Sequence, residues 1–198
     1  MKVGVRCVSV VFAATLSASA RGDSFVEVAT GLAKPLAYDP DDLITVESEK
    51  LGVRYSTDLT RGFAVDMAID WTPITLRYIA IGTPESFTIV TRNRFRLQGG
   101  IRWTTRVDHD LHLFIRASAG VDEIRPHGPR AWRGASDDAG IALELGTGAL
   151  LEIGPWLVGG QVAVPFADHG KTTEFIDYTY DHYRAFDLDL LPTIAHRL

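Results

Sequence analysis

Apolar and polar residues alternate without a break over residues 63–71, which read Phe-Ala-Val-Asp-Met-Ala-Ile-Asp-Trp. Side chains of a β-strand point alternately to opposite faces, so this stretch is predicted to be a strand with one apolar face and one small or acidic face. The acidic face carries Asp66 and Asp70. If the apolar face looks inward, the fold is a soluble sandwich or a lipocalin-like barrel. If it faces lipid, the protein is an outer-membrane barrel with a polar interior.

Seven further segments alternate in the same way, so the sequence predicts eight strands. The eight cover residues 25–33, 51–56, 63–71, 94–103, 111–121, 140–149, 156–166 and 186–198. Between them, short turns alternate with long connections, which cover residues 39–49, 73–93, 123–138 and 167–180. Pro35 and Pro40 mark the first long connection as loop. This order is typical of an antiparallel up-and-down barrel with tight turns at one rim and long loops at the other.

Aromatic residues recur at the ends of the apolar faces. Phe63 and Trp71 are roughly 27 Å apart at about 3.3 Å per residue, and a strand tilted by about 40° climbs roughly 20 Å over that length. Outer-membrane barrels have a lipid-facing band about 25 Å tall, flanked by aromatic side chains at both interfaces. The sequence therefore predicts an aromatic girdle that consists of Tyr55, Phe63, Trp71, Phe95, Trp103, Trp156, Phe166 and Phe186.

The opposite strand faces carry acidic and basic residues among many glycines and alanines. These charged residues are Glu27, Arg54, Asp66, Asp70, Arg94, Arg96, Arg102, Arg116, Glu144, Asp187 and Asp189. The interior of an eight-stranded barrel is just wide enough for side chains to fill, so we predict that these residues close the lumen with ion pairs. Asp66 and Asp70 are predicted to be interior carboxylates with arginine partners, and the sequence does not show whether these are Arg96 or Arg102 because the strand register is not readable from it.

Arginine and lysine are distributed differently along the chain. Every basic residue in the predicted strands is arginine, whereas Lys34, Lys50 and Lys171 are expected outside the strand centres. Arginine is the better partner for buried carboxylates because its planar guanidinium bonds them in a bidentate manner. The bias therefore favours a charged face that is interior rather than exposed to water.

The first 20 residues have the features of a secretory signal peptide. Two basic residues precede a short apolar run, and Ala18-Ser19-Ala20 forms a small-residue cleavage site. Cleavage is predicted after Ala20, which leaves one barrel domain over residues 21–198. The chain has 25 acidic and 20 basic residues, and its one cysteine lies in the signal peptide. An acidic exported domain is not expected to bind nucleic acid, and barrel closure stabilises it without disulfides.

With these features the mature chain resembles the small bacterial outer-membrane β-barrels of the OmpA/OmpX-like superfamily. The resemblance rests on the whole pattern of strands, connections and charges rather than on a short motif. It implies an all-β fold, an eight-stranded antiparallel up-and-down transmembrane β-barrel in the cell envelope. It also implies contact with outer-membrane lipid, lipopolysaccharide and the outer-membrane assembly machinery. Members typically end in an aromatic residue, whereas this chain ends in Leu198.

The third long connection is basic in an otherwise acidic protein. It contains Arg125, Arg130 and Arg133. Guanidinium groups pair well with phosphate, so these three residues are candidates for contact with lipopolysaccharide. A solvated basic loop without a ligand is the alternative interpretation.

Some barrels of this size are lipid-modifying enzymes, which need a nucleophile beside a base. His112 and Ser118 share a strand face but lie roughly 20 Å apart at strand rise, too far for that role. His182, near Tyr178 and Tyr180, is the remaining cluster, and such residues are ordinary in an interfacial belt. No catalytic residue, cofactor or metal site is predicted.

The sequence thus favours a structural or surface-interaction role for an outer-membrane barrel. Two alternatives stay open at this point. One is a soluble periplasmic lipocalin-like barrel that binds a small apolar ligand, with the strand faces reversed. The other is a lipid A-modifying barrel enzyme.

Overall fold

Eight long strands build the wall of the protein in the computed structural model. The described residues are 24–39, 43–45, 48–60, 62–79, 86–126, 138–169, 172–175, 178–180 and 183–198. The wall strands are β1 (Ser24–Asp39), β3 (Ser48–Thr60), β4 (Phe63–Ile79), β5 (Ser86–Arg106), β6 (Leu111–Pro126), β7 (Asp138–Ile153), β8 (Trp156–His169) and β11 (Tyr183–Arg197). The short strands are β2 (Leu43–Thr45), β9 (Thr172–Phe175) and β10 (Tyr178–Tyr180).

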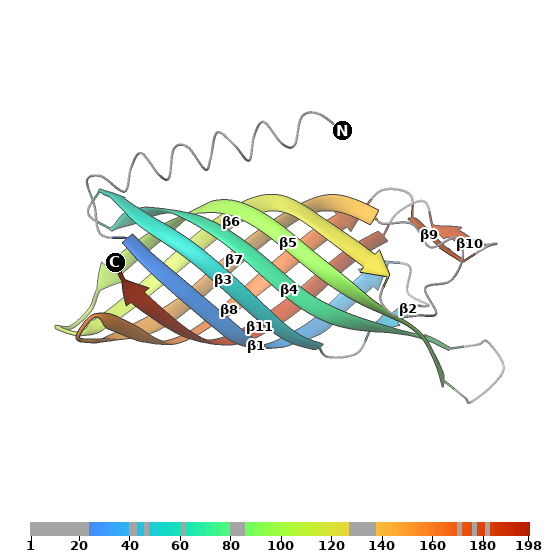
Figure 1. Cartoon of the computed structure of the whole chain (residues 1–198), viewed down its shortest axis with the longest axis horizontal. Coiled ribbons are helices and arrows are strands. Elements are labelled where there is room, and N and C mark those ends of the chain that lie inside the picture. The colour runs from blue at the N-terminus through green and yellow to red at the C-terminus, as the bar shows by residue number, and fades with distance from the viewer. Residues whose placement is uncertain are drawn as a thin grey trace.

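The wall closes on itself. Each long strand pairs antiparallel with its neighbours in the sequence, and β1 also pairs with β11, which joins the two ends of the sheet (Figure 1). Of the short strands, β2 pairs with β4, and β9 and β10 form a separate hairpin. The predicted eight-stranded antiparallel up-and-down barrel is therefore confirmed. No helix among the described residues is long and apolar enough to cross a membrane.

The two ends of the barrel differ. At the turn end, tight connections include Gly62 and Gly154, whose φ angles of 85° and 61° suit glycine rather than a residue with a Cβ. The C-terminus lies at this same end, whereas β9 and β10 lie beyond the opposite, loop end (Figure 1). A backbone hydrogen bond also joins the end of the chain to the start of β1 at the turn end, where the Leu198 amide donates to the Ser24 carbonyl at 2.8 Å.

Side chains alternate between the lumen and the outside along every wall strand. Asp66 and Asp70 lie on the inward face of β4 and are 3 % and 4 % exposed. On the outward face of the same strand, Ile69 is 60 % exposed. The strand over residues 63–71 therefore directs its acidic face into the barrel and its apolar face away from it.

The strands are longer than the sequence pattern predicts. The predicted loop over residues 73–93 is wrong in part, because β4 and β5 continue as a paired ribbon from Thr72 and Arg94 to Ile79 and Ser86. Parts of the other three long connections are also strands, including β2, β9 and β10. Pairing continues beyond the barrel because the backbone ladder does not depend on the apolar alternation that ends near Trp71.

Pro35 does not end the first strand, contrary to the expectation from the sequence. Pro35 lies inside β1, next to an irregularity in the pairing of β1 with β11 between Pro35 and Ala37. A bulge leaves one residue out of the ladder, so a strand tolerates proline there. The expectation that Pro35 marks a loop is therefore wrong.

The close approach of β5 and β6 depends on a glycine. A Cβ at Gly120 would overlap the Leu97 carbonyl oxygen and lie 2.7 Å from the Gln98 Cα, whereas at Gly160 the nearest atom is 3.6 Å away. We expect Gly120→Ala to lower the free energy of unfolding by about 1–3 kcal/mol, the usual cost of overpacking. Gly160→Ala should change it by less than about 0.5 kcal/mol. Urea midpoints of the two variants test this, and equal midpoints would contradict it.

Candidate functional site

The lumen concentrates charge from seven of the eight wall strands, and β8 contributes Gln161 and His169. The structure places all eleven predicted lumen residues on inward faces, and none is more than 6 % exposed. They alternate with outward apolar residues, so the period-two pattern of each strand brings its charges to the axis. The charges form a loop-end cluster, a central hub and a turn-end cluster.

The loop-end cluster joins two arginines on β5 to carboxylates on β6 and β11. Arg94 lies 2.8 Å from Asp122 and 2.6 Å from Asp187. Arg96 contacts the same carboxylates at 3.4 and 3.1 Å. His169 on β8 lies 3.4 Å from Asp122. This cluster therefore crosses the lumen from β5 to β11.

Lys50 is the central hub. Its ammonium lies 2.6 Å from Asp189, 3.0 Å from Asp70 and 3.4 Å from Glu144. The four residues come from β3, β11, β4 and β7, so one side chain connects four strands. The expectation that Asp70 has an arginine partner is therefore wrong, because Asp70 pairs with Lys50.

The turn-end cluster forms around Glu27 on β1. Arg54, Arg102 and Arg116 lie 3.3, 3.4 and 3.8 Å from its carboxylate. Arg116 also contacts Glu144 at 2.6 Å, which links this cluster to the Lys50 hub. Its second donor, Nη1, bonds the Gln161 side-chain oxygen at 2.6 Å. The lumen charges are therefore connected from one strand to the next rather than held as isolated pairs.

A small cluster of apolar side chains lies in the lumen near the turn end. It consists of Phe25, Phe114, Leu150, Leu157 and Ala195, all of them buried. The Arg102 guanidinium lies 5.9 Å from the ring centroids of both Phe25 and Phe114. Such cation–π contacts add a favourable neighbour for a cation that is removed from water.

Asp66 is a weakly compensated carboxylate of the lumen. It lies 4.0 Å from Arg102, farther than Glu27 lies from any of the three arginines around it. Across the β3–β4 pair Asp66 faces Ser56, and across the β4–β5 pair it faces Gly100, which has no side chain. Asp66 thus has an arginine neighbour as expected, but the distance of 4.0 Å indicates a weak contact.

The sequence analysis missed four members of the network. Lys50, Asp122, Gln161 and His169 are all buried and face the lumen. The prediction that all strand bases are arginine is wrong, because Lys50 lies in β3. Lys50, Asp122 and His169 are each an even number of residues from a predicted inward position, so continuing the alternation past the assumed strand ends identifies them.

A further cluster lies at the turn-end rim. The Glu152 carboxylate is 3.0 Å from His112, 3.2 Å from Arg197 and 3.9 Å from Arg106. It ties the last residues of β11 to β6 and β7. His112 is thus a rim residue bonded to Glu152 and is not placed beside Ser118.

All eight predicted girdle residues lie on outward strand faces. Phe63 pairs with Trp103 near the turn end, and Trp71 pairs with Phe95 near the loop end. Two further girdle residues meet at the loop end, where the rings of Phe166 and Phe186 are 4.7 Å apart. Trp156 near the turn end stacks edge-on against His196, at 4.5 Å between centroids. Tyr55 is half-buried and donates a hydrogen bond to Ser24.

Exposed ion pairs lie just beyond the aromatic residues, toward the loop end of the barrel. Arg125 lies 2.8 Å from Glu123 and 5.7 Å from the Phe95 ring centroid. Arg184 lies 3.1 Å from Asp168. Of the other candidate residues, Arg130, Arg133 and His182 lie outside the described residues, as does the predicted signal peptide. Within the described ranges, no group of three or more His, Cys, Asp and Glu side chains is placed to hold a metal ion.

Comparison with known proteins gives no sequence match but clear structural ones. No family model and no curated protein matches the chain. Neisserial surface protein A superposes with a TM-score of 0.60 and 11 % identity, covering 88 % of this chain and 97 % of its own. The chain has the fold of the small outer-membrane β-barrels.

Two further small outer-membrane barrels support this assignment of the fold. OprG from Pseudomonas aeruginosa has a TM-score of 0.57 and 10 % identity, covering 89 % of this chain and 96 % of its own. AlkL, determined in DMPC lipid bilayers, has a TM-score of 0.52 and 11 % identity, covering 89 % and 90 %. With identities this low, the likeness establishes architecture and leaves function to be argued from the site.

Replacing the central hub should destabilise this barrel strongly. Lys50→Met leaves three buried carboxylates without their shared cation, which we expect to lower the free energy of unfolding by about 3–5 kcal/mol. Arg184→Met removes a cation from an exposed pair and should cost less than about 1 kcal/mol. Urea unfolding of both variants in the same detergent measures the difference. Equal losses would contradict the assigned role of Lys50.

Proposed function

We propose that this protein is an outer-membrane β-barrel with a structural or surface-interaction role and a lumen closed by ion pairs. The observation that carries the proposal is the inverted polarity of the barrel. Large apolar residues such as Leu145 and Ile141 are 67 % and 66 % exposed on the outside, while Arg94 and Glu144 are 2 % and 1 % exposed inside.

This polarity suits lipid and not water. Soluble monomers rarely expose contiguous apolar patches larger than a few hundred Å², whereas in this barrel the outward faces of all eight wall strands are apolar. A lipid-facing wall carries no such cost, and the charged side chains are satisfied by one another inside. The lipocalin-like alternative requires an apolar interior, but the described lumen is lined by ion pairs.

The boundaries of the apolar belt support the same proposal. Its aromatic residues lie at two levels, and charged residues follow directly beyond each level. At the loop end these are the Arg125–Glu123 and Arg184–Asp168 pairs. At the turn end they are the exposed residues of the β5–β6 connection, including Asp108 and His109. Such an order matches a hydrocarbon layer between two layers of headgroups.

The two ends of the barrel suggest its orientation in the membrane and its partners. We assign the turn end to the periplasm and the loop end to the outside, because outer-membrane barrels have short periplasmic turns and longer extracellular loops. Arg125, exposed at the loop end, is then positioned near lipopolysaccharide phosphates, which guanidinium groups bind well. The outer-membrane assembly machinery is the expected partner for insertion.

A non-enzymatic role is the simpler interpretation of the site. Among the described residues, His112 is engaged by Glu152 at the rim, and Ser118 lies further along β6, facing the lumen. The carboxylates of the lumen are held in ion pairs. We therefore propose that the protein acts through the barrel itself and its outer surface, in a structural or surface-interaction role.

An arginine in the middle of the belt should impair insertion. Val162 lies between Trp156 and Phe166 on β8, and Val162→Arg should destabilise the inserted barrel by about 2–4 kcal/mol. Val107→Arg, in the exposed β5–β6 turn, should have little effect. The measurement is the fraction of each variant that floats with membranes on a sucrose gradient. Equal flotation, or wild-type protein in the soluble periplasmic fraction, would contradict the membrane assignment.

The lumen is expected not to conduct ions. The Arg94–Asp187 contact joins β5 to β11 at 2.6 Å and the Lys50–Glu144 contact joins β3 to β7 at 3.4 Å, so ion pairs connect strands on opposite sides of the barrel. Purified protein in a planar lipid bilayer should therefore give no steady current above that of protein-free bilayers. A large steady conductance would refute the closed lumen and leave the membrane assignment intact.

A further inference from the structure

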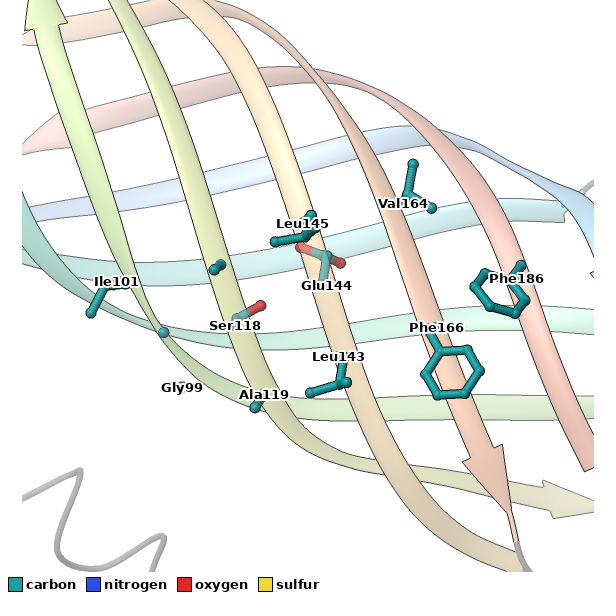
Figure 2. Close-up of a pocket in the computed structure, with 12 residues that line it drawn as sticks. Gly99, Ile101, Ser118, Ala119, Leu143, Glu144, Leu145, Val164, Phe166 and Phe186 are labelled. Carbon is teal, nitrogen blue, oxygen red and sulfur yellow. The ribbon is translucent and has the colours of Figure 1, made fainter.

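An apolar groove crosses the outer wall of the barrel. It has a volume of about 710 Å³, in the range of about 300–1,000 Å³ typical of ligand sites. Figure 2 shows its lining on neighbouring strands, with Leu143, Phe166 and Phe186 side by side and Glu144 pointing away from them. The pairing of Leu143 with Phe166 and of Phe166 with Phe186 places these three residues in one row across β7, β8 and β11.

Small side chains form the floor of this groove. Gly99 on β5 pairs with Ala119 on β6, and Ala117 on β6 pairs with Ile101. All four residues lie on outward faces. Gly99, Ala117 and Ala119 are small, whereas most other outward positions of the wall carry large apolar residues. Leu145, paired with Ala117, projects beside the floor and is 67 % exposed. The depression is therefore built into the sequence, because it arises from small outward residues on two adjacent strands.

A second depression continues the groove toward the turn end. It has a volume of about 400 Å³ and shares Ile101, Ala117 and Leu145 with the first, so the two adjoin. Its far end is lined by Phe63 and Trp103, which belong to the turn-end aromatic level. The combined groove thus runs obliquely between the two aromatic levels of the wall.

We propose that this groove is a binding site for an acyl chain of a membrane phospholipid. The inference rests on the proposed membrane location of the barrel. The outward side chains along the groove are hydrocarbon, so it offers a headgroup or a sugar no side chain for hydrogen bonding. Its long shape between the aromatic levels fits an extended chain whose polar end lies at a membrane interface.

Packing is the force that would hold the chain there. In a bilayer, lipid tails are as apolar as leucine, so the hydrophobic effect does not drive association and van der Waals contact decides it. A chain in the groove contacts protein on its floor and both sides, whereas a chain on a convex wall contacts it on one side.

A second copy of the protein fits the groove less well. In a two-fold symmetric dimer whose axis passes through this patch, groove faces groove and neither groove is filled. The acyl chain is therefore the occupant that the shape favours.

Filling the groove should displace the lipid. Ala117 lines both depressions and faces outward, so Ala117→Phe fills their junction without entering the lumen. We expect the affinity for a phospholipid with two saturated acyl chains to fall about tenfold, as expected when about ten van der Waals contacts between heavy atoms are lost. The measurement is native mass spectrometry of detergent-purified protein titrated with that phospholipid.

The matched control is Val53→Phe. Val53 faces outward on β3, is 47 % exposed and does not line the groove, so this variant should bind lipid like the wild type. Equal binding by Ala117→Phe and Val53→Phe would overturn the inference, as would a wild-type dimer that Ala117→Phe converts to a monomer. All variants are first floated with phospholipid vesicles. Failure of the wild type to float refutes the membrane assignment, whereas flotation with equal lipid binding refutes only the groove.

Discussion

The need to pair every charge inside the barrel is the constraint on which the rest of the structure depends. A charge removed from water is costly unless an opposite charge and hydrogen bonds meet it, and breaking one buried pair costs more than an exposed pair contributes. In this lumen some pairs join neighbouring strands and others join strands that are not neighbours, as when Lys50 on β3 meets Asp189 on β11 and Glu144 on β7. A one-residue slip of any strand would turn its charges toward the apolar side, so the lumen specifies the register of the wall.

The same constraint explains why one lysine stands among five buried arginines. Arg94 and Arg96 face two carboxylates in a small loop-end cluster, a task that suits a planar fork of donors. At the hub, carboxylates from β4, β7 and β11 converge from three directions. A compact ammonium with three rotatable donors fits that arrangement better than a planar group. The identity of the base therefore follows from the geometry of its acids.

The sequence predicts the faces of the strands because alternation is a local property, and it fails where contacts are not local. Phe63 and Asp66 are assigned to opposite sides by parity alone. The partner of Asp70 is different: Arg96 is its neighbour across the β4–β5 pair, yet Arg96 contacts Asp187 on β11. Which side chains meet across the lumen depends on barrel tilt and closure. Lys50 and Asp122 were missed for another reason, since the apolar pattern stops before the hydrogen-bonded strands do.

The glycine pair at Gly99 and Gly100 shows how the two faces of one strand are constrained separately. Glycine weakens a strand, so two in succession within the barrel wall require a reason. For Gly100 the reason lies on the lumen side of the strand, because a Cβ at this position would lie only 2.6 Å from the Cβ of Ser118. Gly99 points the other way, into the groove, where the lumen imposes no such limit. A small residue on the lipid side is accounted for if the groove has an occupant, and an acyl chain is an occupant that leaves the ion pairs behind it undisturbed.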